Sequence, residues 1–228
     1  MSTLPIRAGA RGPRGRAGSA LAVPRTKRWF DVAVCGAALV LLAPLLAVLA
    51  LAVRLTSRGP VIFRQERLGL GGRPFAVLKF RTMHAGAGDA LHRSYVTLQL
   101  TQDCPVRSGD GGLFKLEHDP RVTRVGRWLR RTSLDELPQL VNVLRGEMSL
   151  VGPRPALAWE AALYRDGDHA RFEVLPGITG LWQVSGRSRL PMREALALDV
   201  EYARRRTFLL DLQILARTVP TVLRREAT

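Results

Sequence analysis

The longest feature of the hydropathy pattern is an uncharged apolar run, Val32–Val53. A helix over this run is roughly 33 Å long, enough to cross the hydrocarbon core of a membrane. Pro44 near its centre predicts a kink or a break. Basic residues flank both ends, which favours the cytoplasmic side for both. Two structures stay open here: a helix that enters, turns at Pro44 and leaves by the same face, and an ordinary kinked span. A signal sequence is a third alternative, because a long basic segment precedes the run, although the run is longer than the apolar part of a typical signal peptide.

A change to period-two patterning follows the apolar run. The short β-branched and aromatic segments Pro60–Phe63 and Phe75–Phe80 flank a glycine-rich turn, which predicts a β-hairpin. A glycine-rich turn beside cations can hold phosphate, although an ordinary hairpin with solvated charges has the same pattern. Neither a Walker A loop nor a dinucleotide fingerprint is present. The basic residues near the strand ends are Arg64, Arg67, Lys79 and Arg81.

A basic amphipathic helix is predicted further along the chain. Residues 85–114 are polar with weak periodicity and suggest a loop or a short helix. Asp119 is then a candidate N-cap, with Pro120 at the first helical position. Such a basic helix can lie on an anionic membrane, line a phosphate site or present a solvated face. Its apolar stripe consists of Val122, Val125, Trp128 and Leu129.

Two more helices are predicted near the C-terminus. Leu190–Arg206 is amphipathic and places Asp199 and Tyr202, three residues apart, on one face. Phe208–Leu223 is strongly apolar but is interrupted by a proline. We expect this last helix to lie against a membrane surface or the core.

The stretch that most strongly suggests catalysis carries two adjacent carboxylates, Asp135 and Glu136. Ser133 and Glu136 match a capping box, and Pro138 offers a competing helix start; Gly146 would end the helix. Either start places the carboxylates at or just before a helix N-terminus, where free backbone N–H groups favour phosphate. The aspartate could attack phosphorus, and the glutamate could help to hold a divalent metal. Alternatively, both carboxylates only cap the helix and balance its dipole.

The charge balance narrows the class of partner. The 228 residues include 35 Lys and Arg but 19 Asp and Glu, a formal net charge of +16. This excess predicts an anionic partner, such as nucleic acid, anionic lipid or a phosphorylated substrate. No aromatic–basic RNA motif or zinc-finger spacing occurs, which argues against nucleic acid. We expect Cys35 and Cys104 to stay reduced.

Several short motifs occur in order between Lys27 and Glu226. They are Lys27-Arg28-x-Phe30-Asp31, the proline-broken apolar run, Gly59-Pro60-x-x-Phe63-x-Gln65-x-Arg67, Lys79-Phe80-Arg81-Thr82-Met83, Asp119-Pro120-Arg121-x-Thr123-x-x-Gly126, Thr132-Ser133-Leu134-Asp135-Glu136-Leu137-Pro138-Gln139, Met148-Ser149-Leu150-Val151-Gly152-Pro153-Arg154-Pro155 and Pro176-Gly177-x-Thr179-Gly180-Leu181-Trp182-Gln183. In this order they resemble the bacterial sugar transferase family, the monotopic polyprenol-phosphate phosphoglycosyltransferases. One departure is Ala43, where some members have serine before the proline.

The resemblance implies a reaction. A sugar-1-phosphate would pass from a UDP-sugar to undecaprenyl phosphate with release of UMP, as the first step of exopolysaccharide, capsule or O-antigen-type assembly. Asp135 would be the nucleophile and form an aspartyl-phosphosugar. Asp135 and Glu136 would hold the required Mg²⁺. The residues to which the resemblance gives phosphate-binding, substrate-facing or supporting roles are Lys79, Arg81, Arg154, Arg187, Asp199 and Tyr202.

The resemblance also implies a topology and a location. It favours the re-entrant helix hairpin, kinked at Pro44, in the bacterial inner membrane with the active site on the cytoplasmic face. The expected fold is α+β and mostly helical. Residues 1–26 would be a disordered basic arm able to bind anionic membrane lipids, 27–57 the membrane-inserted broken helix, and 58–228 a small cytoplasmic catalytic domain with the β-hairpin and surface amphipathic helices.

Two other functions compete with this one. A non-enzymatic basic module that binds membrane surfaces or nucleic acid would explain the charge but not the ordered motifs. A glycosyltransferase that moves the sugar alone would release UDP instead of UMP. Glucose, galactose and N-acetylated sugars all stay open as the group that is carried.

Overall fold

The computed structural model describes residues 23–84, 90–101, 119, 121–186 and 190–223. Within these residues the chain is mostly helical, with two small two-stranded sheets. This agrees with the predicted α+β class. Arg187 and most of the basic arm lie outside the described residues.

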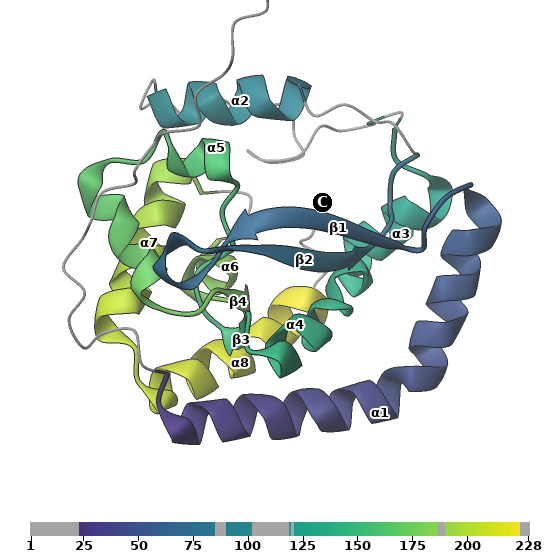
Figure 1. The fold of residues 1–228 in the computed structure, drawn as a ribbon, viewed down its shortest axis with the longest axis horizontal. Helices are drawn as coiled ribbons and strands as arrows, with labels where there is room; N and C mark the ends of the chain where they lie inside the picture. The colour runs from purple at the N-terminus through teal and green to yellow at the C-terminus, as the bar shows by residue number, and fades with distance from the viewer. Residues whose placement is uncertain (1–22, 85–89, 102–118, 120, 187–189, 224–228) are drawn as a thin grey trace, which may run out of the picture.

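The apolar run forms part of one long helix, α1 (Arg25–Thr56), which borders the lower and right-hand sides of the molecule in Figure 1. The helix consists of a lower arm and a second arm that rises towards the start of β1 (Figure 1). Pro44 lies inside α1, and a proline there removes a backbone donor and bends a helix. Among the described residues, α1 alone is long and apolar enough to cross a membrane. Only 11% of its most apolar window is buried, so α1 is not a core helix.

The predicted β-hairpin is confirmed. Strands β1 (Ile62–Leu68) and β2 (Pro74–Phe80) pair antiparallel, and the short 3-10 turn η1 (Leu70–Gly72) joins them. The register pairs Phe63 with Lys79 and Arg67 with Phe75. Because side chains alternate along a strand, these four residues share one face of the hairpin.

The remaining elements fold around the hairpin and α1 (Figure 1). Helix α2 lies along one edge of the molecule, and α7 and α8 follow the predicted C-terminal helices closely. The elements are α2 (Ala90–Thr101), α3 (Arg124–Thr132), η3 (Leu134–Glu136), α4 (Gln139–Arg145), β3 (Ser149–Val151), α5 (Ala158–Ala161), η4 (Asp166–Glu173), β4 (Gly177–Thr179), α6 (Leu181–Ser185), α7 (Met192–Arg205) and α8 (Phe208–Leu223).

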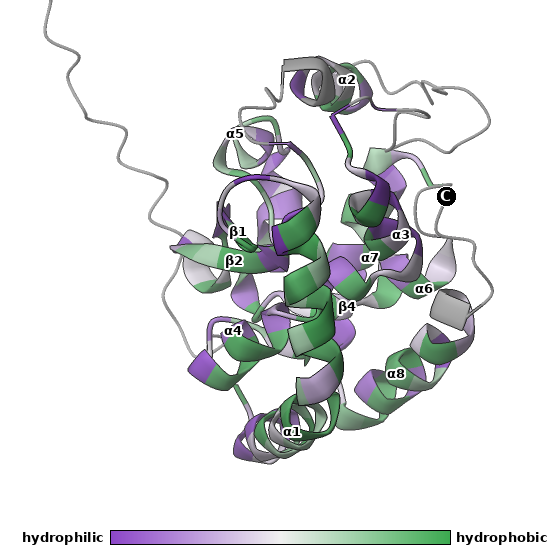
Figure 2. Ribbon diagram, turned by 90° about the vertical axis from the view of Figure 1, so that its right-hand side faces the viewer, coloured by the Kyte–Doolittle hydropathy of each residue, from purple (hydrophilic) through white to green (hydrophobic). Residues whose placement is uncertain are grey.

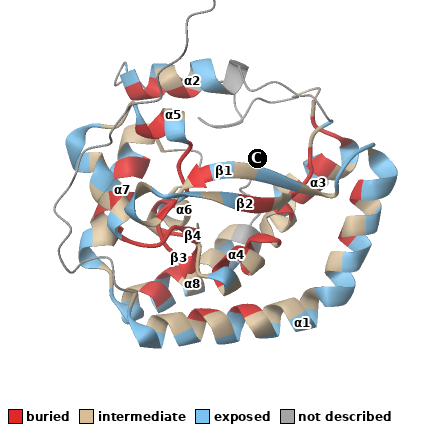
Figure 3. Cartoon of the chain, in the orientation of Figure 1, coloured by how far each residue is buried: buried red, intermediate tan, exposed pale blue. Residues whose placement is uncertain are grey.

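The second sheet was not predicted from the sequence. Strands β3 and β4 pair in parallel, with Ser149 opposite Gly177 and Val151 opposite Thr179. Strands this short give too little alternation to detect. Gly152 and Gly177 bring their backbones so close that a Cβ on either would collide with main-chain atoms. This small sheet forms the buried centre of the molecule (Figure 3).

Within the described ranges, the buried apolar side chains form three clusters. The largest surrounds β3 and includes Val143, Met148 and Val151. A second cluster joins the upper arm of α1 to the hairpin and α3, and the third joins α2 to α7. Most of α1 and much of α8 have the colour of hydrophobic residues in Figure 2, and several of these residues are exposed. Those exposed on the two helices include Val40, Leu41, Val48, Leu51, Leu55, Leu209, Leu212 and Val219.

The predicted start of the basic helix at Asp119 and Pro120 was wrong. Helix α3 begins at Arg124, because Thr123 is the N-cap and its side chain accepts a hydrogen bond from the Gly126 N–H. Val122 precedes the helix and forms a β-bridge with Met83. Because Val122 takes part in this bridge, the helix starts only after it. The bridge also joins the start of α3 to the chain segment that follows β2.

Gly126→Ala is expected to destabilise the fold by about 1–3 kcal/mol, the usual cost of overpacking. A Cβ at Gly126 would collide with the backbone of Thr82, against which α3 packs. The midpoint of thermal unfolding measures the effect. Gly167→Ala is the control, because a Cβ there has nothing within 4 Å. Equal midpoints for both variants would contradict the close packing of α3.

Candidate active site

The two adjacent carboxylates lie on a turn between α3 and α4. Helix α3 ends at Thr132 and is followed by its C-cap Ser133, which has a left-handed conformation with φ of 57°. It is the one non-glycine residue with positive φ among the described residues. The chain then forms η3, which holds Asp135 and Glu136, and continues into α4 at Gln139.

The predicted capping box was wrong, because Ser133 makes no side-chain cap to η3. Its own backbone N–H donates to the Arg130 carbonyl and helps to end α3. The competing start at Pro138 is close to what the structure shows, since Pro138 directly precedes the first residue of α4. The carboxylates therefore lie in a tight reversal between two helices.

Lys79, for which the sequence predicted a phosphate-binding role, lies beside the carboxylates, and that role stays a prediction. Its Nζ lies 2.6 Å from Glu136 Oε1, and both side chains are partly exposed. The Asp135 residue is 9% exposed. The site thus combines a largely buried aspartate with a glutamate that a lysine from β2 orients.

Arg130 is a second cation near Asp135. Burial lowers the pKa of the Arg130 guanidinium, while the Asp135 and Asp119 carboxylates oppose that shift. Arg130 belongs to the last turn of α3, and the left-handed turn at Ser133 folds the chain back towards it. Sequence reasoning placed Arg130 only within a run of basic residues, since the reversal has no periodic signal.

Arg154 and Asp199 line one pocket, together with Glu160, Tyr164 and Trp182. Arg171 Nη2 lies 2.6 Å from both the Arg154 carbonyl and Asp199 Oδ2. Burial raises the pKa of the Asp199 carboxyl to about 6, and the Arg171 guanidinium opposes the shift. The sequence thus identified two residues that do share a pocket, but it missed the buried arginine that connects them.

Arg81 and Tyr202 make structural contacts. Arg81 Nη2 donates to the Ser57 carbonyl at 2.6 Å and so fastens the end of α1 to the hairpin. Tyr202 donates to Asp211 Oδ1 at 2.6 Å within the core. Neither contact supports the predicted substrate role of these two residues, which stays a prediction, as does that of Arg187.

The donor set at the turn fits Mg²⁺. No cluster of three or more His, Cys, Asp or Glu side chains occurs in the described part of the chain. Asp135 and Glu136 therefore offer at most two carboxylates. Mg²⁺ usually binds through one or two carboxylates, water and substrate phosphate, whereas calcium and structural zinc need fuller protein cages.

Comparison with known proteins identifies the family of the chain. The family model for the bacterial sugar transferases matches residues 23–225. The chain is 43% identical to the UDP-glucose:undecaprenyl-phosphate glucose-1-phosphate transferase of Caulobacter vibrioides, over 96% of this chain and 76% of the relative. It is 39% identical to the exopolysaccharide production protein ExoY of Rhizobium meliloti, over 86% of this chain and 84% of the relative. The undecaprenyl-phosphate galactose phosphotransferase of Salmonella typhimurium is 40% identical over 88% of this chain, which spans 41% of that longer protein.

A match of this extent settles the class. The chain belongs to the bacterial sugar transferase family.

Proposed function

We propose that the protein transfers a sugar-1-phosphate from a UDP-sugar to undecaprenyl phosphate and releases UMP, as the first step in assembling an exopolysaccharide, capsule or O-antigen-type glycan. The observation that carries this proposal is the turn that places Asp135 beside the oriented Glu136 and near Arg130, in a chain of this family. The names of the Caulobacter and Salmonella relatives specify this type of transfer. A non-enzymatic basic module would not need such a buried carboxylate.

In the proposed first step, a carboxylate oxygen of Asp135 attacks the phosphorus that carries the sugar. The bond from that phosphorus to the bridging oxygen breaks, and UMP leaves with the electron pair. In the second step a phosphate oxygen of undecaprenyl phosphate attacks the same phosphorus and releases the Asp135 carboxylate. Covalent catalysis of this kind divides one difficult transfer into two easier ones.

Positive charge from the protein would stabilise the phosphates during both steps. Lys79 holds Glu136, and Arg130 lies near Asp135. Arg154 lines the pocket that also contains Asp199. When bound by Asp135 and Glu136, Mg²⁺ would supply further neutralisation of the diphosphate charge.

For α1 we propose a re-entrant arrangement in the bacterial inner membrane, with the active site on the cytoplasmic face. The interior Pro44, the two arms in Figure 1 and the exposed apolar side chains of α1 support it. Residues 27–57 would be the inserted segment and 58–228 the cytoplasmic domain, with residues 1–26 as a basic arm for anionic lipid. In intact cells, a tag at the N-terminus should be inaccessible to a protease or antibody added outside. An accessible, extracellular tag would exclude this arrangement.

The test of the reaction is the nucleotide that is released. Protein extracted from membranes is given Mg²⁺, undecaprenyl phosphate and a panel of UDP-sugars that begins with UDP-glucose and UDP-galactose. UMP with one donor is expected and would identify the sugar. UDP would indicate transfer of the sugar alone. No nucleotide from any donor, combined with salt-sensitive lipid binding, would favour the binding module.

A further inference from the structure

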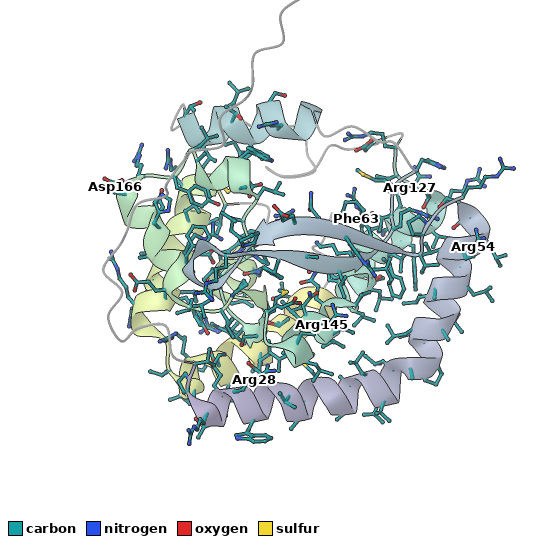
Figure 4. The ribbon with its side chains drawn as sticks, in the orientation of Figure 1. Arg28, Arg54, Phe63, Arg127, Arg145 and Asp166 are labelled. Carbon is teal, nitrogen blue, oxygen red and sulfur yellow. The ribbon has the colours of Figure 1, made fainter. Side chains whose placement is uncertain are left out.

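A strip of three side chains on β1 has no role in the chemistry described so far. Phe63, Gln65 and Arg67 alternate along the strand and therefore share one face of the hairpin. The register places Phe63 opposite Lys79, the lysine that bonds Glu136. Gln65 is the next residue of β1 on the same face. The strip thus begins beside the active-site carboxylates, and Figure 4 shows Phe63 at the end of the hairpin nearest Arg127 of α3.

Arg67 fixes the orientation of the Gln65 amide. Its Nε and Nη2 atoms both donate to Gln65 Oε1, at 3.1 and 2.8 Å. Because both donors take the oxygen, the amide nitrogen must point away from Arg67. Within the described part of the chain, that Nε2 group has no hydrogen-bond partner, and Gln65 is only half-buried. A donor that is already oriented is therefore available to a ligand.

The charge of Arg67 lacks a paired anion. Arg67 is 8% exposed, and its remaining hydrogen bond goes from Nη1 to the Pro155 carbonyl at 2.9 Å. Among the residues that the structure describes, no carboxylate lies within ion-pair distance of it. Burial lowers the pKa of the guanidinium to about 10, aided by Arg154 and opposed by Glu160, Tyr164 and Glu136. A buried charge without a counter-ion is costly, so an anion nearby would be favourable.

We propose that Gln65 donates to the phosphate that stays with the nucleotide, the phosphate of the departing UMP, and that Arg67 is the positioning residue that orients Gln65 and supplies positive potential. This inference rests on the proposed function. It assigns this subsite to the soluble donor and not to the lipid acceptor. Strand β1 starts beside the end of α1 and runs away from it towards α5 and α7 (Figure 1). Arg67 is therefore about 13 Å along the strand from Phe63, on the side far from α1.

The test uses Gln65→Glu, which replaces the donor by a carboxylate that pairs with Arg67. Equilibrium dialysis of the full-length protein measures the binding of labelled UMP and of labelled uridine. We expect the Kd for UMP to rise about 10- to 100-fold, the range for a hydrogen bond to a charged group. The Kd for uridine should change less than about twofold, because uridine lacks the phosphate. In turnover, the KM for the UDP-sugar should rise while that for undecaprenyl phosphate stays constant.

Two further variants keep the test decisive. Gln65→Ala removes the donor without adding charge and should also raise the Kd for UMP. Glu66→Gln is the matched control, because Glu66 is exposed and points to the opposite face of the hairpin. Three results would each overturn the inference. They are an unchanged UMP affinity in both Gln65 variants, a loss of uridine affinity equal to that for UMP, and a rise in KM for undecaprenyl phosphate alone. The proposed function is judged separately, by UMP release from the unaltered protein in the same preparation.

Discussion

Replacing Asp135 with asparagine is expected to lower the rate of UMP release by at least about a thousandfold, the scale on which removal of a covalent nucleophile acts. Asparagine keeps the size of the side chain but has no anionic oxygen to attack phosphorus. Asp135 is 9% exposed within a tight reversal, and water from the bulk would replace the nucleophile poorly there. Nucleotide release with the UDP-sugar that the unaltered protein accepts is the measurement.

A second measurement isolates the covalent step. With donor but no undecaprenyl phosphate, the unaltered protein should release a burst of up to one UMP per active site, because the lipid is needed only for the second half of the reaction. Asp135→Asn should show no burst. Asp166→Asn is the control, since Asp166 is exposed on η4 far from the hairpin centre (Figure 4). A burst that persists in Asp135→Asn would mean that another group is the nucleophile.

Replacing Asp211 with alanine is expected to cost about 3–5 kcal/mol of stability, the usual effect of breaking a buried ion pair. Asp211 is 4% exposed, and its Oδ2 lies 2.5 Å from Lys27 Nζ at the start of α1. Its other oxygen accepts the Tyr202 hydroxyl. The substitution therefore removes the carboxylate from a partly buried cation and a buried hydroxyl, and leaves each with only its hydrogen bond to the Val151 carbonyl. For a chain of this size the midpoint of thermal unfolding should fall by about 6–20 °C.

The control for Asp211 is an exposed ion pair that also lies in the C-terminal part of the chain. Glu201 pairs with Arg205 one turn along α7, with side chains 43% and 75% exposed. Glu201→Ala should change stability by less than about 0.5 kcal/mol, because solvent screens such pairs. A midpoint for Asp211→Ala within that range would show that Lys27 and Tyr202 find new partners and that the network is not a stabilising contact.

Local patterns predicted the elements that depend on local chemistry. The β-hairpin, α7 and α8 follow from period and from turn residues. The resemblance gave Lys79 only a phosphate-binding role, and its ion pair with Glu136 was not predicted. Asp199 and Tyr202 do lie on one buried face of α7, as their spacing requires. They differ in what they meet, since one reaches Arg171 and the other Asp211. Spacing fixes a face but not the partner across it.

The features that the sequence did not reveal depend on contacts between distant segments. Ser133 matches a capping box locally, but the packing of α3 on Thr82 and the reversal into η3 require it to end a helix instead. The pairing of β3 with β4 joins segments that are each too short to show a pattern. Arg67 was visible as a basic residue near a strand end and as the last residue of one motif, but its burial and its hydrogen bond to Pro155 come from the folded chain.

The fastening of α1 at both ends has a consequence for the lipid. At the lower end, Arg28 donates to the Val143 and Leu144 carbonyls, while Asp31 accepts from Ser149. At the upper end, Arg81 binds Ser57. Both arms are thus fastened to the same folded domain, which restrains the angle between them. In the proposed arrangement the protein itself sets how deeply the bend at Pro44 reaches into the bilayer. A thinner or thicker membrane must then deform around the helix. The height of Asp135 above the lipid phosphates stays constant.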